Sequence, residues 1–182
     1  VPFTVAIGGG RKYFEKRDDG RNLTDELKEK GYQVAYTIDE LKNIQSGKVI
    51  GLLAEGHPAA YPERGELLTD GVTKALQVLS QNERGFFLMI EGSQIDWGGH
   101  SNDTETIIKE MLDFDRTIDV VYNFADNNPG TLVVVTADHE TGGMSLLGGD
   151  FSTGRVDAKY STGGHSGVMV PVFSYGSGSQ YF

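Results

Sequence analysis

The sequence predicts an α/β fold, a mostly parallel central sheet with helices on both faces. Strand-like apolar runs alternate with helical patterns along most of the chain, which is typical of parallel sheets connected through helices. Two of these runs, Phe86–Ile90 and Thr131–Ala137, are short and continuously apolar. Such runs are typical of strands that are covered on both faces.

The first half of the chain divides into short elements whose ends carry capping residues. Asn22 is a suitable N-cap, and Gly31 follows the expected end of the same helix. Thr37 is a second N-cap. The predicted elements are strand Val1–Ile7, helix 23–30, strand Tyr32–Tyr36, helix Ile38–Asn43, strand Lys48–Ala54 and helix 68–82.

The second half contains one long helix and two further strands. Asn102 or Asp103 can cap a helix from Thr104 to about Ala125. Thr131–Ala137 is expected to be a central strand, and Val168–Tyr175 is expected to be an edge strand because it contains Pro171. The apolar stripe of the long helix is predicted to consist of Ile107, Ile108, Met111, Leu112, Ile118 and Val121.

Composition and charge restrict the classes of function. The chain has 182 residues, no cysteine and a net charge of −10. Disulfides and thiolate zinc sites are therefore excluded, and neither a nucleic acid nor an anionic membrane is an expected partner. No apolar run approaches the length that spans a bilayer. Residues 1–182 are expected to form a single α/β domain.

Metal-ligating residue types concentrate in EGSQIDWGGH, residues 91–100. Asp96 and His100 are four positions apart, the spacing of a ligand pair on a helix, although Gly98 and Gly99 favour a loop or a strained helix start. Together with His165 they supply two imidazoles and one carboxylate. That donor set leaves a fourth tetrahedral position open, as in a catalytic zinc site.

Asp138 and His139 form a second cluster directly after the strand predicted at Thr131–Ala137. Sites in open α/β sheets lie at the carboxyl ends of strands, which supports a second metal position here. Two ligands are too few for a tight site, so further ligands must come from elsewhere. An ordinary turn aspartate beside a surface histidine is the alternative for this pair, and Glu91 could equally be a helix cap or an ion-pair partner.

Two remaining candidates have plainer explanations. His57 lies in a proline-containing loop without a nearby acidic or histidine partner in the sequence, so a structural or surface histidine is expected. Trp97 is expected to pack within the fold, and the alternative is that it forms a wall beside a bound substrate. The glycines at Gly8–Gly10 lack the spacing of a phosphate-binding loop and are interpreted as a turn.

Four stretches of the chain resemble the carboxyl-terminal half of bacterial enzymes of the alkaline phosphatase family. They are GGGRKYF (8–14), GFFLMIEGSQIDWGGH (85–100), TLVVVTADHETGG (131–143) and GGHSGVMVPVF (163–173). The resemblance implies an alkaline-phosphatase-like core that is incomplete, so that the chain is a carboxyl-terminal fragment of a larger domain.

The resemblance also implies a function and a role for each matching residue. It implies hydrolysis of phosphate monoesters at a site with two zinc ions and one magnesium ion. It further implies a homodimer for the full-length protein and a periplasmic or secreted location. The matching ligands are Asp96, His100 and His165 for the first zinc, Asp138 and His139 for the second zinc, and Glu91 for magnesium.

Several groups of the family's site have no counterpart in this sequence. The nucleophilic serine of the family lies in an Asp-Ser-Ala/Gly type of motif, which is absent from the chain. The isolated chain is therefore expected to be inactive. Two alternatives are a non-catalytic, metal-stabilised binding module and a related metal-dependent hydrolase of the phosphodiesterase or sulfatase type.

Overall fold

A computed structural model describes residues 3–182 of the chain, which form two compact units, one ending at Ile90 and the other running from Glu91 to Phe182. Val1 and Pro2, the first residues of a predicted strand, lie outside the described residues. Among residues 3–182, no helix combines the length and the apolar character needed to cross a membrane.

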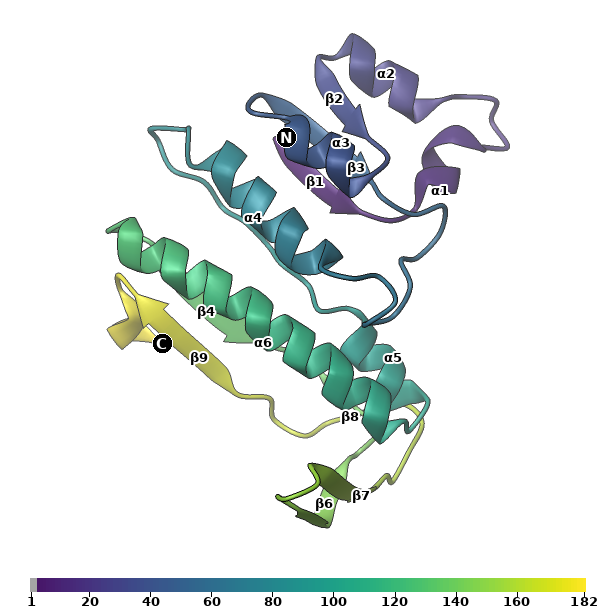
Figure 1. Ribbon diagram of the computed structural model, residues 1–182, viewed down its shortest axis with the longest axis vertical. Helices are drawn as coiled ribbons and strands as arrows, with labels where there is room; N and C mark the ends of the chain where they lie inside the picture. Colours follow the sequence, from purple (N-terminus) through teal and green to yellow (C-terminus); the bar gives the residue numbers. More distant parts are fainter. Residues whose placement is uncertain (1–2) are drawn as a thin grey trace. The chain divides into compact units, whose positions relative to one another are not determined.

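The first unit is built on a three-stranded parallel sheet. Its strands are β1 (Val5–Gly8), β2 (Tyr32–Ala35) and β3 (Lys48–Leu52), in the order β1-β3-β2 (Figure 1). Val49 on the central strand pairs with Val5 on one side and with Gln33 on the other. Three of the four strands predicted in this unit are thus present, with β2 and β3 shorter than expected and β1 ending at Gly8, one residue beyond the expected end.

Helices cover both faces of this sheet. Successive residues of β3 point to opposite faces, so that Val49 and Ile50 belong to different core clusters. Val49 packs with Leu41 and Val78, whereas Ile50 shares its cluster with Phe14 and Leu27. The helices are α1 (Arg11–Glu15), α2 (Leu23–Glu29), α3 (Ile38–Asn43) and α4 (Leu67–Leu79).

The two predicted N-caps of the first unit are confirmed. The Asn22 side chain accepts hydrogen bonds from the backbone N–H groups of Thr24 and Asp25. The Thr37 hydroxyl accepts from the backbone N–H of Glu40 at 3.1 Å. These bonds satisfy N–H groups that have no partner within the helix, which is why the helices begin where the sequence predicts.

The strand predicted at Phe86–Ile90 is wrong. These residues have no regular secondary structure, and Phe87 and Met89 are 89% and 75% exposed. A strand requires a hydrogen-bonded neighbour, and none of the strands within residues 3–182 pairs with this segment. The apolar composition of Phe86–Ile90 is thus typical of a strand, but the segment forms no strand within residues 3–182.

The second unit combines two helices with pairs of antiparallel strands. The helices are α5 (Gln94–His100) and α6 (Thr104–Asn127), and Asp103 caps α6 by accepting from two backbone N–H groups. In Figure 1 the hairpin of β6 and β7 extends away from the other elements of this unit. The strands are β4 (Leu132–Thr136), β5 (Glu140–Thr141), β6 (Ser145–Asp150), β7 (Arg155–Lys159), β8 (His165–Ser166) and β9 (Val172–Gly176); η1 (Ser179–Tyr181) follows.

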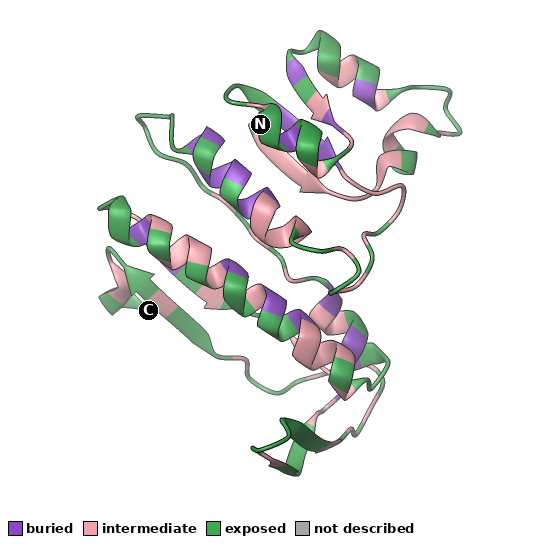
Figure 2. Ribbon diagram, viewed as in Figure 1, coloured by how far each residue is buried: buried purple, intermediate pink, exposed green. Residues whose placement is uncertain are grey.

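Two predictions for the second unit are wrong. β4 is not a central strand, because within the described residues it pairs with β9 alone, in antiparallel orientation. The expected apolar stripe of α6 is also incorrect, because Met111 and Leu112 are 47% and 55% exposed. The buried positions of α6 are instead Glu110, Asp113, Thr117 and Ala125 (Figure 2).

The α/β class is confirmed, with a parallel sheet of three strands. Pro171 directly precedes β9, where its missing N–H removes no hydrogen bond from the strand pair. All the metal-ligating residues that the sequence predicts lie in Glu91–Phe182. The arrangement of α5, β5 and β8 within that unit therefore determines the geometry of the site.

Candidate metal centre

Helix α5 places Asp96 and His100 one turn apart on the same face. The loop or strained helix start that the two glycines predict is wrong, because Gly98 and Gly99 both lie within α5. A Cβ on Gly98 would approach Ile107 of α6 to 2.8 Å, and one on Gly99 would approach the Thr141 carbonyl oxygen to 2.8 Å. The glycines are needed for close packing against α6 and β5.

His165 reaches the same place from strand β8. This strand pairs with β5 in antiparallel orientation, and the register puts His165 opposite Thr141. Because Gly99 lies against Thr141 as well, α5 and β8 are held on the same short strand. Residues far apart in the sequence are thereby brought to one point.

The ligand atoms of Asp96, His100 and His165 all lie within 4.8 Å of one another. The Nε2 atoms of the two imidazoles are 3.2 Å apart. One oxygen of the Asp96 carboxylate is 3.5 Å from His100 Nε2, and the other is 3.7 Å from His165 Nε2. All three side chains are partly exposed, which leaves access from solvent.

The chemistry of this donor set fits a zinc ion. Two imidazole nitrogens bound tetrahedrally at about 2.05 Å would lie about 3.3 Å apart, close to the observed separation of Nε2 atoms. His100 Nδ1 is 2.7 Å from the carbonyl oxygen of Gly163. Because a carbonyl only accepts, Nδ1 carries a proton, and Nε2 is the ring nitrogen that faces the other ligands.

Asp138 and His139 form a second pair beside this group. Their carboxylate oxygen and Nε2 atom are 3.3 Å apart, so the turn after β4 brings both side chains toward one point. The His139 ring stacks on His165, with centroids 3.5 Å apart. The two predicted ligand clusters are therefore neighbours in space.

Glu91 is not part of the group that Asp96, His100 and His165 form among residues 3–182. It precedes α5 and is exposed. Trp97 is 41% exposed. His57 is exposed and lies in the first unit.

Sequence reasoning missed the polar residues of β5. The Thr141 hydroxyl is 2.6 Å from Asp96 Oδ1 and 3.2 Å from His139 Nδ1. The Glu140 carboxylate accepts hydrogen bonds from the Ser166 hydroxyl and from the backbone N–H groups of Gly143 and Met144. These bonds, the Ser166 bond foremost, lower the pKa of Glu140. Both residues directly follow His139, which is the one signal that points to them.

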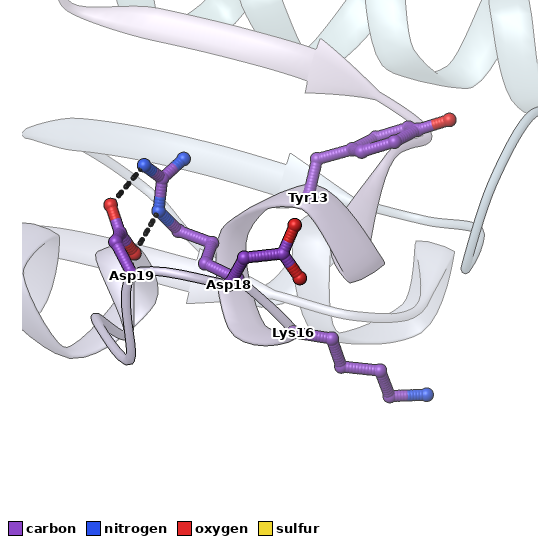
Figure 3. Close-up of a pocket in the computed structure, with 5 residues that line it drawn as sticks. Tyr13, Lys16, Asp18 and Asp19 are labelled. Atoms are coloured by element: carbon purple, nitrogen blue, oxygen red, sulfur yellow. Dashed lines mark hydrogen bonds and ion pairs between the residues drawn. The ribbon is translucent and has the colours of Figure 1, made fainter.

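A separate depression of about 360 Å³ lies in the first unit, lined by Tyr13, Lys16, Arg17, Asp18 and Asp19 (Figure 3). Its cations are already paired. Arg17 makes two hydrogen bonds to Asp19, which lower the pKa of Asp19 to about 2, and Lys16 pairs with Glu55. The depression therefore offers no free positive charge to an anion.

A family model described as alkaline phosphatase matches residues 2–156 of the chain. The chain belongs to the alkaline phosphatase family. The matched stretch includes α5, α6 and the Asp138–His139 pair, whereas His165 lies beyond its end.

Curated relatives support this membership over much of the chain. Alkaline phosphatase 4 of Bacillus subtilis is 43% identical over 145 residues, which cover 78% of this chain and 31% of that protein. Alkaline phosphatase of Escherichia coli is 28% identical over 210 residues, which cover 97% of this chain and 44% of that protein. The chain spans about a third to under a half of the length of these relatives.

Solved structures of the family extend the match to the whole chain. Alkaline phosphatase from the Antarctic bacterium TAB5 has a TM-score of 0.90 and 37% identity, and covers 99% of this chain and 55% of its own. A histidine-to-aspartate variant of that enzyme, with magnesium bound, has a TM-score of 0.88 and 36% identity. The recognised family and its association with metal are thus confirmed, while the assignment of single ligands stays a prediction.

Proposed function

We propose that this chain carries the metal-binding part of a phosphate monoesterase site with two zinc ions and one magnesium ion. The observation that supports this proposal is the convergence of Asp96, His100 and His165 in a member of the alkaline phosphatase family. The substrates are small phosphate monoesters, and the reaction is their hydrolysis.

The six predicted ligands divide among three metal positions in this proposal. Zinc, when bound, supplies Lewis-acid stabilisation of charge on phosphoryl oxygens and on the attacking and leaving oxygens. The ligands are Asp96, His100 and His165 for the first zinc, Asp138 and His139 for the second zinc, and Glu91 for magnesium.

The residues of the chain contribute ligand geometry and orientation. The Gly163 carbonyl fixes the His100 ring so that Nε2 faces the site. Stacking of His139 on His165 holds the two clusters side by side. Because the chain has a net charge of −10, a phosphate ester is attracted only if bound cations reverse the local field.

The nucleophile of the proposed reaction is a serine outside these 182 residues. Ser93, Ser101 and Ser166 are near ligands in the sequence, but none stands in an Asp-Ser motif. The Ser166 hydroxyl donates to the Glu140 carboxylate, and its proton is therefore already engaged. We expect the isolated chain to bind zinc weakly and to show little or no turnover.

The broader biology of the proposal follows from the family. The 182 residues are part of a single larger α/β domain, and the full-length protein is a homodimer that acts in the periplasm or after secretion. Match to the alkaline phosphatase model favours this proposal over a phosphodiesterase or a sulfatase. No nucleic acid or membrane partner is part of it.

Zinc content of the purified chain tests the ligand assignment. We expect His100→Ala and His165→Ala to bind less zinc than the unchanged chain at the same free zinc concentration, measured by equilibrium dialysis and atomic emission. His57→Ala is the matched control, because it removes the one remaining histidine outside the two clusters, and should leave zinc content unchanged. Unchanged stoichiometry in His100→Ala and His165→Ala would contradict the assignment.

Hydrolysis of p-nitrophenyl phosphate tests the second part of the proposal. The zinc-loaded chain should release p-nitrophenol no faster than the same concentration of zinc ions does in buffer without the protein. A robust rate that is abolished by a serine substitution within the chain would show that the nucleophile lies here, and the proposal for an external serine would fail.

A further inference from the structure

Thr141 occupies the point where the two ligand clusters meet. It lies on β5, opposite His165 of β8, and its Cβ and Cγ2 atoms lie against Gly99 of α5. The side chain is half-buried, and none of the ligand roles assigned above uses it. Its position alone places it beside residues of both proposed zinc sites.

The hydrogen bonds of Thr141 have one consistent direction. Its Oγ1 atom is 2.6 Å from Asp96 Oδ1, and an ionised carboxylate accepts only, so the hydroxyl proton goes to Asp96. The hydroxyl oxygen must then accept from His139 Nδ1, at 3.2 Å. His139 is thereby held in the tautomer with Nδ1–H and a Nε2 lone pair.

This hydroxyl acts on one ligand of each zinc position. The Asp96 oxygen that accepts from Thr141 is the one nearer His165, and the other oxygen faces His100. His139 directs its Nε2 atom toward Asp138. A single side chain therefore orients the carboxylate of one cluster and sets the tautomer of the other.

We propose that Thr141 is a positioning residue that couples the two zinc positions through its hydroxyl group. The inference rests on the zinc sites proposed above and adds a residue that binds no metal itself. A metal bound at either position orders Asp96 or His139, and the shared hydroxyl transmits that order to the other ligand. Partners of this kind typically change metal affinity by about 10- to 100-fold when removed.

Zinc affinity of the 182-residue chain, measured by competition with a chromophoric chelator, tests the proposal. Thr141→Val keeps the shape of the side chain and removes the hydroxyl, and we expect zinc binding to weaken by about 10- to 100-fold. Thr141→Ser keeps the hydroxyl and should restore affinity close to that of the unchanged chain. Thr131→Val is the matched control, because the Thr131 hydroxyl donates to the Asn128 carbonyl and takes no part in the proposed ligand network.

The outcomes separate the two proposals. If the unchanged chain does not bind zinc, the proposed metal site is refuted, and the role of Thr141 is refuted with it. Binding by the unchanged chain with equal affinity in Thr141→Val would defeat only the role of Thr141. Loss of affinity in Thr141→Ser as great as in Thr141→Val would also overturn it, because the hydroxyl would then be irrelevant.

The tautomer of His139 gives a readout that needs no metal. Long-range ¹H–¹⁵N spectra of the zinc-free chain should show His139 protonated at Nδ1. Thr141→Val should lose this preference, and Thr141→Ser should keep it. A Nε2–H tautomer of His139 in the unchanged chain would refute the proposed direction of the hydrogen bonds.

Discussion

Gly99 sets how closely helix α5 can approach β5. An added Cβ would lie 2.8 Å from the Thr141 carbonyl oxygen and 2.9 Å from the Thr141 Cβ atom. Backbone atoms cannot swing aside as the end of a long side chain can. The small residue is therefore a condition for bringing His100 and Asp96 next to the strand that positions His165.

Replacement of Gly99 by alanine tests this role. In a helix interior, alanine is usually more stable than glycine by about 0.5–1 kcal/mol. Overpacking costs about 1–3 kcal/mol, so we expect Gly99→Ala to lower the free energy of unfolding and to weaken zinc binding. Urea denaturation and chelator competition measure the two effects.

The control for this prediction is Gly167→Ala. A Cβ at Gly167 would meet nothing within 4 Å, and its backbone is not in the left-handed region. It should leave both stability and zinc binding nearly unchanged. A stabilised Gly99→Ala chain would show that helix propensity outweighs the contact and that α5 has room to move.

The candidate ligands can be predicted from their residue types, whereas Thr141, which orients two of them, cannot. Histidine and aspartate are residue types that bind zinc, and Asp96 and His100 stand four positions apart in one short stretch of the sequence. Thr141 has no such signal, because threonine is common on strands for its shape alone. Its role depends on the register of β5 against β8, which no local pattern encodes.

Helix α6 begins at a cap that can be tested at the scale of the element. The Asp103 carboxylate accepts from the backbone N–H groups of Glu105 and Thr106 and from the Thr106 hydroxyl. The Thr106 hydroxyl bond, followed by the backbone bond to the same residue, lowers the pKa of Asp103. The ionised cap therefore stabilises the folded state.

Asp103→Ala should destabilise the chain by about 1 kcal/mol at neutral pH, the usual cost of losing such a cap. The stabilisation from the charge is present above the ordinary pKa of 3.8 and is lost as the pH falls through the lowered value. Asp103→Asn retains an accepting oxygen but cannot titrate, so it should keep most of the stability without this pH dependence. Urea midpoints measured between pH 3 and pH 7 compare the three chains, and equal pH dependence in Asp103→Asn would contradict the assignment.

Helices of this chain were more predictable than its strands. A helix makes its hydrogen bonds within a few residues and its caps are local, so Asn22, Thr37 and Asp103 revealed where helices begin. A strand depends on a partner that its own sequence does not name. Phe86–Ile90 has strand composition but no paired strand among residues 3–182, and β4 has one neighbour where two were expected.

At the scale of the whole molecule, each unit has its own arrangement of elements. The first has a three-stranded parallel sheet with a core on each face, and the second has helices α5 and α6 with paired antiparallel strands. All six proposed metal ligands belong to the second unit. Binding of zinc should therefore act on one part of the chain first.

Hydrogen exchange with and without zinc tests this expectation. A ligand present at 100 times its dissociation constant stabilises the state that binds it by about 2.7 kcal/mol, which slows exchange through that opening by about 100-fold. We expect slower exchange in α5, β5 and β8, because opening any of them separates Asp96, His100 and His165. The strands β1, β2 and β3 contain no proposed ligand and should exchange at unchanged rates.

The zinc-treated His165→Ala chain is the control, and should show no protection in either unit. Equal protection in β3 and in β5 would mean that these amides exchange only when the whole chain unfolds. That result would refute the expectation that the effect of zinc is confined to Glu91–Phe182.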